Sequence, residues 1–231
     1  NLVVRAANAF RAEAGVTDGI RMHLDKRVPV AAGLGGGSGN AATALLALNE
    51  LFECPLGPQQ LARLASQLGY DVPFFLQTKP ALATGRGEII QSLDWFPALQ
   101  SAWILLVHPG FGISTAWAYQ SLKRFPQTLH GQPGRAQRFV ESLQSGTLDE
   151  ASPDFYNSFE ASAFEKHPIL ALYKEFLRET GATAALMSGS GSAVFALATS
   201  QDAASALRDH FLSRFGESPW TEVLPVGPSC A

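Results

Sequence analysis

Apolar residues recur at helical spacing in several stretches of the 231-residue chain. In the first stretch, Leu2 to Glu13, five apolar residues from Leu2 to Phe10 fall on one helix face. The same period predicts six further helices, at Ser38–Phe52, Gln59–Leu68, Thr115–Lys123, Ala136–Leu143, Leu170–Glu179 and Ala203–Arg214. Between these predicted helices lie shorter segments with a different pattern.

Those shorter segments predict strands. Ile20 to Leu24 alternates apolar and polar residues as a half-buried strand does, whereas Trp103–Val107 is a continuous apolar run typical of a buried strand. Further strands are predicted at Thr183–Met187, Ala193–Leu197 and Trp220–Val226, the first two joined by a Ser-Gly-Ser-Gly turn. The order of these elements favours an α+β fold whose C-terminal part is ferredoxin-like. Residues 123–134, rich in Gln, Pro, Gly and Thr, predict a linker or surface loop.

A glycine-rich segment leads into the helix predicted at Ser38–Phe52. It reads Pro29, Val30, Ala31, Ala32, Gly33, Leu34, Gly35, Gly36, Gly37, Ser38, Gly39, Asn40. Glycine allows positive φ and close approach of the backbone to a ligand, and a helix start offers unpaired N–H groups and a positive dipole end. We therefore expect this segment to bind phosphate. A flexible surface loop is the alternative, which the flanking proline and the amphipathic helix disfavour.

Two common phosphate loops do not fit the segment. A Walker A loop ends in Gly-Lys-Ser/Thr, whereas Ser38 is followed by Gly39 and Asn40, with no lysine in the loop. A dinucleotide loop needs Gly-x-Gly-x-x-Gly and an acidic residue further along. The glycine spacing differs from that pattern, and Glu53-Cys54-Pro55 at the corresponding place reads as a helix end.

The segment resembles the phosphate loop of the GHMP kinases, written Pro-x-x-x-Gly-Leu-Gly-Ser-Ser-Ala. Further segments in the same order resemble other motifs of that family: Gly69–Phe75, Gly85–Glu88, His108–Thr115, Asn157–Glu160 and the second glycine-rich loop within Met187–Phe195. The resemblance spans residues 1–197 and implies the α+β GHMP kinase fold. An incomplete N-terminal ATP-binding α/β domain of the ribosomal-protein-S5-like type is then expected at 1–100, and a ferredoxin-like C-terminal domain at 101–231.

The Gly-Leu-Gly-Gly-Gly-Ser-x-Asn-Ala-Ala form of the loop is similar to one branch of the family. That branch phosphorylates the 2-hydroxyl of 4-diphosphocytidyl-2-C-methylerythritol with ATP in the non-mevalonate isoprenoid pathway. The resemblance therefore implies ATP and Mg²⁺ as cofactors and a cytidine-diphosphate sugar alcohol as the small-molecule substrate. Another GHMP kinase, of the homoserine or mevalonate type, and a nucleotide-binding fragment without turnover stay open as alternatives.

The resemblance also implies residue roles. Asp71, in Gly-Tyr-Asp-Val-Pro, would be the catalytic carboxylate that accepts or orients the proton of the acceptor hydroxyl. The loop from Pro29 to Asn40 would bind the ATP phosphates, with the Ser38 hydroxyl on phosphate or Mg²⁺, and Asn1, Lys26 and Asn40 would contact adenosine. The substrate side would include Thr115, Asn157, Gly189 and Gly191.

Several of these residues have a plainer interpretation. Asp71 could serve as a turn or cap residue, Ser38 as a helix N-cap, and Lys26 as a solvated strand end. Asn40 could cap the loop-to-helix turn, Glu160 could lie on a helix surface, and residues 188–192 could form a hairpin without ligand contacts. Two positions depart from the family pattern: Gly39 stands where a second serine is usual, and Ser158 replaces an aspartate.

Composition narrows the function classes. The net charge of −3 and the isoelectric point near 6.0 disfavour nucleic acid as a partner. No apolar run reaches the length of a membrane span, and no signal peptide opens the chain. The two cysteines, Cys54 and Cys230, and the five histidines form no metal or disulfide pattern. We expect a cytoplasmic protein, monomeric or homodimeric, without membrane or nucleic-acid partners.

The first helix matches a position about 60 residues into the family pattern. The preceding part of that pattern contains a lysine that activates the substrate hydroxyl and a Gly-Tyr-His segment at the cytosine end. No residue of this chain is assigned either role, so the sequence is expected to be a fragment.

Overall fold

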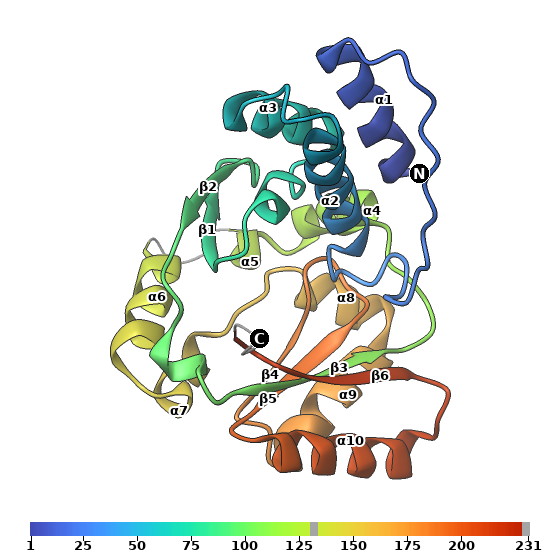
Figure 1. Ribbon diagram of the computed structural model, residues 1–231. Helices are drawn as coiled ribbons and strands as arrows, with labels where there is room; N and C mark the ends of the chain where they lie inside the picture. The colour runs from blue at the N-terminus through green and yellow to red at the C-terminus, as the bar shows by residue number, and fades with distance from the viewer. Residues whose placement is uncertain (130–133, 228–231) are drawn as a thin grey trace. The chain divides into compact units, whose positions relative to one another are not determined.

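The computed structural model describes residues 1–129 and 134–227 (Figure 1). They belong to two compact units. The N-unit comprises Asn1–Val28 and Gly35–Asp94, and the C-unit comprises Pro29–Leu34 and Trp95–Ala231. The chain therefore passes from one unit to the other inside the glycine-rich segment, between Leu34 and Gly35. The expected division at residue 100 stays a prediction.

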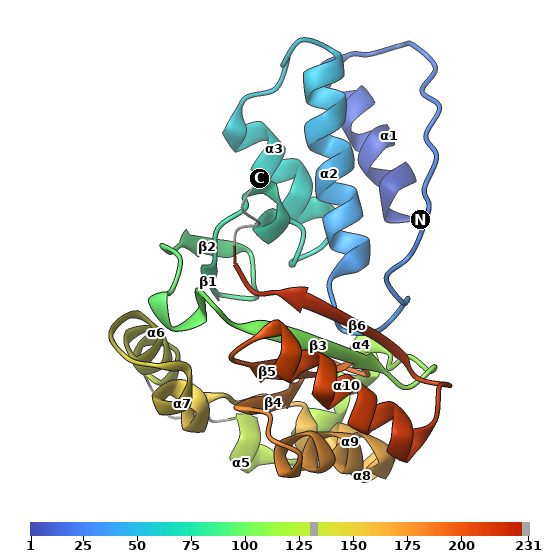
Figure 2. The same ribbon diagram turned by 60° about the horizontal axis from the view of Figure 1, so that its bottom comes forward.

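The N-unit consists of three helices and a hairpin. The helices are α1 (Leu2–Ala14), α2 (Gly36–Leu51) and α3 (Pro58–Leu68), followed by the 3₁₀ helix η1 (Pro73–Leu76) and the antiparallel pair β1 (Ala81–Thr84) and β2 (Ile89–Ser92). Figures 1 and 2 show α1 beside α2. Their apolar faces meet α3 in a core that includes Phe10, Leu45, Leu64 and Val72. This core confirms the helical periodicity of the sequence.

The strand expected at Ile20–Leu24 is absent. This segment has no regular secondary structure, and neither sheet among the described residues includes it. The alternation of apolar and polar residues is real, but a strand also needs a neighbour that completes its hydrogen bonds. Met22 and Leu24 accordingly stay largely exposed.

The C-unit contains a four-stranded antiparallel sheet. Its strands are β3 (Trp103–His108), β4 (Ala184–Met187), β5 (Val194–Ala198) and β6 (Trp220–Pro225), in the order β4-β5-β3-β6. Helix α9 (Pro168–Glu179) precedes β4, and α10 (Gln201–Phe215) connects β5 to β6. This β-α-β-β-α-β arrangement confirms the ferredoxin-like prediction.

Both faces of this sheet are packed. Helices α9 and α10 cover one face, as Figure 2 shows, where Leu105, Met187 and Val194 meet Leu170 and Phe211. On the other face, Ala184 and Leu197 form a smaller cluster with Leu148 and Phe155. The alternation of side chains along each strand produces these two clusters.

The remaining elements of the C-unit are short. They are η2 (Pro97–Leu99), α4 (Thr115–Ser121), η3 (Leu122–Arg124), α5 (Pro126–Leu129), α6 (Arg135–Ser145), α7 (Leu148–Ala151), η4 (Ser152–Asp154) and α8 (Glu160–Lys166). The expected loop at 123–134 thus contains part of η3 and all of α5, while residues 130–133 lie outside the described residues. Cys54 is a free, exposed thiol, and Cys230 and His130 also lie outside the described residues. Within the described ranges, no helix has the length and apolar character of a membrane span.

Candidate nucleotide and substrate sites

The N-terminus of α2 is formed by the glycines of the predicted phosphate loop. The helix begins at Gly36, two residues before the predicted start, and its first turn closes through the Gly39 N–H, which donates to the Gly35 carbonyl at 2.9 Å. Gly35 is the N-cap residue, with φ +65°, and no side chain caps this end. The N–H groups of Gly36, Gly37 and Ser38 therefore lack intrahelical acceptors. This end of the helix is suited to an anion.

Ser38 and Asn40 lie inside this helix. Ser38 is its third residue, so the alternative that it is the N-cap is wrong, and Asn40 lies beyond the first turn. The Ser38 hydroxyl lies in the first turn of the helix and does not cap it. Its contact with phosphate or Mg²⁺ stays a prediction.

Lys26 supplies a positive charge at the same helix end. Its Nζ lies 2.8 Å from the position that a Cβ on Gly36 would occupy. In the described residues, no carboxylate pairs with this ammonium group, and the neighbouring Asp25 pairs with Arg27 at 3.2 Å. A lysine and a positive helix end together favour a bound anion. Lys26 is exposed, as the plainer interpretation held, but it does not end a strand.

Phe75 packs so close to the loop that a Cβ at position 35 would clash with it, whereas a Cβ at position 39 would make an ordinary contact. A Cβ on Gly35 would lie 2.5 Å from the Phe75 ring, and one on Gly39 would lie 3.4 Å from it. Phe75 belongs to η1, which directly follows the Asp71 turn. Phe75 is part of the Gly69–Phe75 motif, but its residue type alone did not predict this contact.

Asp71 lies in an exposed turn between α3 and η1. The turn is fixed on both sides: the Val72 N–H donates to the Gly69 carbonyl at 3.1 Å, and the Val72 side chain is fully buried. In the described part of the chain, the Asp71 carboxylate has no hydrogen-bonding or ionic partner. An exposed carboxylate on a rigid turn can accept a proton from a hydroxyl.

The Gly85–Glu88 motif forms the turn of the β1–β2 hairpin and lies against Asp71. A Cβ on Gly87 would lie 3.8 Å from Asp71 Oδ1 and 3.6 Å from the Tyr70 carbonyl oxygen. Arg86 Nη1 donates to the Tyr70 hydroxyl at 3.3 Å, a contact that raises the pKa of Arg86. The motif thus supports the Asp71 turn, a role that its sequence did not reveal.

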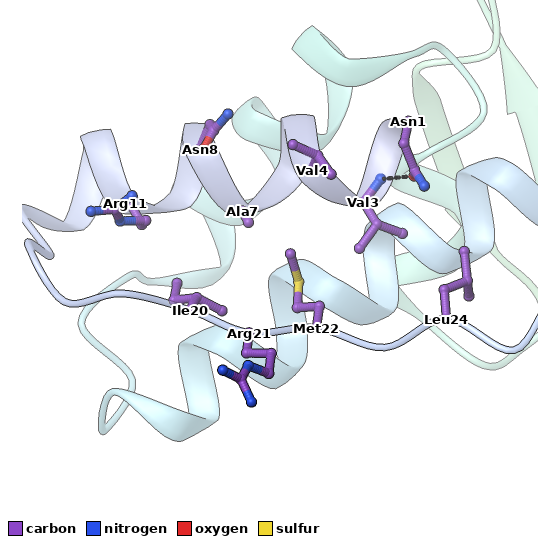
Figure 3. A pocket seen from close by; sticks show the side chains of 10 residues that line it. All are labelled: Asn1, Val3, Val4, Ala7, Asn8, Arg11, Ile20, Arg21, Met22 and Leu24. Atoms are coloured by element: carbon purple, nitrogen blue, oxygen red, sulfur yellow. Dashed lines mark hydrogen bonds between the residues drawn. The ribbon is translucent and has the colours of Figure 1, made fainter.

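A pocket of ≈ 400 Å³ lies between α1 and the Ile20–Leu24 segment. Figure 3 shows Val3 and Ala7 directed from α1 toward this segment, and Met22 directed toward the helix. Asn1 lies at one end, where its Oδ1 accepts a hydrogen bond from the Val3 N–H at 3.0 Å. Its lining combines apolar side chains with those of Asn1, Asn8, Arg11 and Arg21, and ligand sites commonly combine apolar walls with a few polar groups. Adenosine contact by Asn1 stays a prediction.

The first half of the phosphate loop packs within the C-unit on the second glycine-rich loop. Ser188 Oγ donates to the Gly33 carbonyl at 2.9 Å, and the Ala193 N–H donates to the Ala32 carbonyl at 2.9 Å. A Cβ on Gly33 would overlap the Ser188 carbonyl oxygen and lie 2.9 Å from the Gly191 nitrogen. The two glycine-rich motifs, far apart in sequence, are therefore in backbone contact.

The four residues proposed for the substrate side meet at this second loop. Thr115 Oγ1 lies 3.2 Å from the Oγ of Ser190, the residue between Gly189 and Gly191 in the sequence. Asn157 Nδ2 donates to the Met187 carbonyl at 2.7 Å and to the Gly189 carbonyl at 2.8 Å. Substrate binding by these residues stays a prediction, and the Asn157 side chain is occupied by backbone partners.

His108 ends β3 as a buried side chain. Its Nδ1 accepts from the Gly110 N–H at 3.3 Å, and its Nε2 is buried without a partner among the described residues. Burial lowers the pKa of His108, so the neutral ring is the stable form.

The donor set fits Mg²⁺ that arrives with a nucleotide. Across residues 1–129 and 134–227, no cluster of three or more His, Cys, Asp or Glu side chains could hold a metal ion. Mg²⁺ commonly keeps several waters and is held by substrate phosphates with few protein ligands. The contact of the Ser38 hydroxyl with such an ion stays a prediction.

Comparison with protein families agrees with this arrangement. Residues 1–79 match the model described as "GHMP kinases N terminal domain", and residues 139–217 match "GHMP kinases C terminal". The chain belongs to the GHMP kinases. The first match contains the phosphate loop and Asp71, and the second contains Asn157 and the second glycine-rich loop of this GHMP kinase.

Two curated relatives bear the name 4-diphosphocytidyl-2-C-methyl-D-erythritol kinase. The relative from Syntrophotalea carbinolica is 41% identical over 216 residues, which cover 94% of this chain and 73% of the relative. The relative from Pelotomaculum thermopropionicum is 43% identical over 204 residues, covering 88% of this chain and 69% of the relative. Both are longer than this chain.

Solved structures show the same fold. A crystal structure of 4-(cytidine 5'-diphospho)-2C-methyl-D-erythritol kinase is 35% identical, with a TM-score of 0.76 over 98% of this chain and 79% of that one. A homoserine kinase from Cytophaga hutchinsonii is 20% identical, with a TM-score of 0.80 over 97% and 75% of the two chains. The second likeness shows the GHMP fold alone.

Proposed function

We propose that this chain transfers the γ-phosphoryl group of ATP to the 2-hydroxyl of 4-diphosphocytidyl-2-C-methyl-D-erythritol. The products would be the 2-phosphate and ADP, in the non-mevalonate route to isoprenoid precursors. The names and identities of the curated relatives support this substrate. The observation that carries the proposal is the uncapped N-terminus of α2 with Lys26 Nζ beside Gly36.

The residues of the chain supply positioning and charge. ATP, when bound with Mg²⁺, supplies the phosphoryl group and the leaving ADP. The N–H groups of Gly36 to Ser38 and the Lys26 ammonium hold phosphate oxygens, and the Ser38 hydroxyl binds phosphate or Mg²⁺. Asn1 and the pocket beside α1 bind adenosine, with Asn40 as a further polar contact.

Asp71 acts on the acceptor hydroxyl. Its carboxylate takes the hydroxyl proton as the new O–P bond forms. A carboxylate on a fixed turn, without a partner among the described residues, is suited to this role. On the C-unit, Thr115 and the backbone of Gly189 and Gly191 would bind the polar acceptor, with Asn157 beside them. Phosphoryl transfer depends on such positioning more than on covalent catalysis.

The test is ATP-dependent phosphorylation of 4-diphosphocytidyl-2-C-methyl-D-erythritol. The chain is assayed alone and together with any native residues that precede Asn1, with homoserine and mevalonate as competing acceptors. Turnover of the cytidyl substrate that Asp71→Asn abolishes supports the proposal. Phosphorylation of another acceptor refutes the substrate, and ATP binding without turnover in both forms indicates a nucleotide-binding protein.

A further inference from the structure

A half-buried ion pair lies beneath the second glycine-rich loop. Lys174 Nζ, on α9, lies 2.6 Å from Glu160 Oε2, at the start of α8, and the two side chains are 16% and 14% exposed. In each of the other ion pairs among the described residues, one of the two side chains is at least 56% exposed; Arg124 and Glu165, for example, are 62% and 48% exposed. Burying two charges is costly unless further hydrogen bonds use them. We therefore expect at least one of these two charged groups to make a further hydrogen bond.

Glu160 makes that contact with the backbone. Its Oε1 accepts from the Met187 N–H at 2.9 Å, at the end of β4 where the second loop begins. Lys174 holds Oε2, so the carboxylate is fixed at both oxygens. A hydrogen bond from a backbone N–H to a charged acceptor is stronger than one to a neutral acceptor.

Asn157 holds the same backbone from the other side. Its Nδ2 uses both hydrogens, on the Met187 and Gly189 carbonyls, and its Oδ1 accepts from the Phe159 N–H at 2.9 Å. The N–H and the carbonyl of Met187 are thus both bound by side chains of the Asn157–Glu160 motif. The loop that leaves Met187 has little freedom at its origin.

The second glycine-rich loop in turn contacts the Pro29–Leu34 segment of the phosphate loop. Ser188 and Ala193, at its two ends, donate to the Gly33 and Ala32 carbonyls at 2.9 Å each. Between them, the Gly191 N–H donates to the Ser188 carbonyl at 2.9 Å. Residues 29–34 thus rest on a loop whose origin is fixed by Asn157 and Glu160.

We propose that Glu160 is a positioning residue, which together with Asn157 holds the second loop and, through it, the Pro29–Leu34 half of the phosphate loop, while Lys174 balances the charge of its carboxylate. This rests on the proposed function, because its effect on catalysis requires that the loop bind ATP. Lys174 touches no nucleotide in this scheme. It acts only through the carboxylate that it fixes.

Two neutral double variants test the contact. Glu160→Gln with Lys174→Met removes both charges and keeps an acceptor for the Met187 N–H, whereas Glu160→Leu with Lys174→Met removes the acceptor at similar volume. Replacing a buried ion pair by neutral residues is often tolerated, so both are expected to fold. Glu165→Gln, in the exposed pair with Arg124, is the matched control for loss of a salt bridge.

The expected result is a change in KM for ATP. The Gln variant stays within about threefold of the unsubstituted chain, and the Leu variant raises KM for ATP about tenfold, with KM for the acceptor unchanged. The control changes neither. Equal KM values for the two double variants would overturn the proposal, as would a purely thermal loss of stability with unchanged kinetics.

Hydrogen exchange separates this proposal from the proposed function. Without nucleotide, amide protection in residues 188–193 falls in the Leu variant and not in the Gln variant, well below the unfolding temperature. This result stands even if the chain phosphorylates no acceptor. Unchanged protection in the Leu variant refutes the positioning role whatever the substrate.

Discussion

Gly33 offers a stringent test of the contact between the two glycine-rich loops. Its φ of +78° is unfavourable for any other residue, and a Cβ there would overlap the Ser188 carbonyl and lie 2.9 Å and 3.0 Å from the Gly191 nitrogen and oxygen. All of these are backbone atoms, which cannot rotate away as the end of a side chain can. Gly33→Ala should therefore disturb the C-unit.

The expected loss follows from two terms. The left-handed conformation costs a residue with a Cβ about 1–2 kcal/mol, and the crowding adds about 1–3 kcal/mol. The lower entropy of the unfolded alanine chain offsets about 0.4–1 kcal/mol. The net decrease in the free energy of unfolding is about 1–5 kcal/mol.

Gly37→Ala is the matched control for stability. Gly37 lies four residues further along, has no positive φ, and a Cβ there would meet only Leu2 Cδ1 at 3.5 Å. Because alanine favours a helix over glycine, this change should raise stability by up to about 1 kcal/mol.

Urea denaturation, followed by circular dichroism and tryptophan fluorescence, measures both variants. Fluorescence reports the C-unit, because the four tryptophans, Trp95, Trp103, Trp117 and Trp220, all lie there. If Gly33→Ala unfolds at the same urea concentration as the unsubstituted chain, the close backbone contact inferred here is wrong.

Three further predictions concern single side chains. Asp71→Asn should lower kcat about 10²–10⁴-fold with little change in the affinity for ATP, measured by single-turnover assays and calorimetry; an unchanged kcat excludes Asp71 as the base. Lys26→Met should weaken ATP binding about tenfold and make it less dependent on salt, as titrations at two ionic strengths would show, and equal salt slopes would contradict its place beside the phosphates. Burial lowers the pKa of His108 in the folded chain, so the unfolded chain binds its proton first as the pH falls. The contribution of His108 to stability is therefore complete above pH 6.5 and is lost as the pH falls through the lowered folded-state pKa. His108→Asn, which keeps an acceptor for the Gly110 N–H, should flatten this decline by at most about 1.4 kcal/mol per pH unit in urea titrations, and parallel profiles would refute the assignment.

Local patterns predicted most of the fold. The helical period located α1, α2, α3, α9 and α10, and the apolar runs located β3 to β6, because both patterns depend on burial that each element repeats along its length. The strand at Ile20–Leu24 failed for the opposite reason. Its pattern describes one surface, whereas its hydrogen bonds depend on a neighbour that a local pattern does not contain.

The sequence predicted which motifs form the candidate site, but it did not predict the contacts between them. The phosphate loop and Asp71 follow from residue type and family resemblance. The contact of Gly33 with Ser188 joins residues 155 positions apart, and the Glu160–Lys174 pair joins neighbouring helices, so neither shows in a local window. Glu160 looked like a surface residue because its charge alone suggested exposure. The resemblance of Asn157–Glu160 to a motif of the GHMP kinases was the available signal of another role.

The uncapped start of α2 links the stability of the N-unit to its ligand. Helices usually satisfy their first N–H groups with a side chain, and loss of such a cap typically costs about 0.5–2 kcal/mol. Here Gly35 contributes no side chain, so a bound phosphate would complete the helix. A ligand at one hundred times its dissociation constant adds about 2.7 kcal/mol to the stability of the form that binds it. The melting temperature of this chain should therefore rise with nucleotide concentration. The glycines that leave the helix start uncapped also determine how large this rise is.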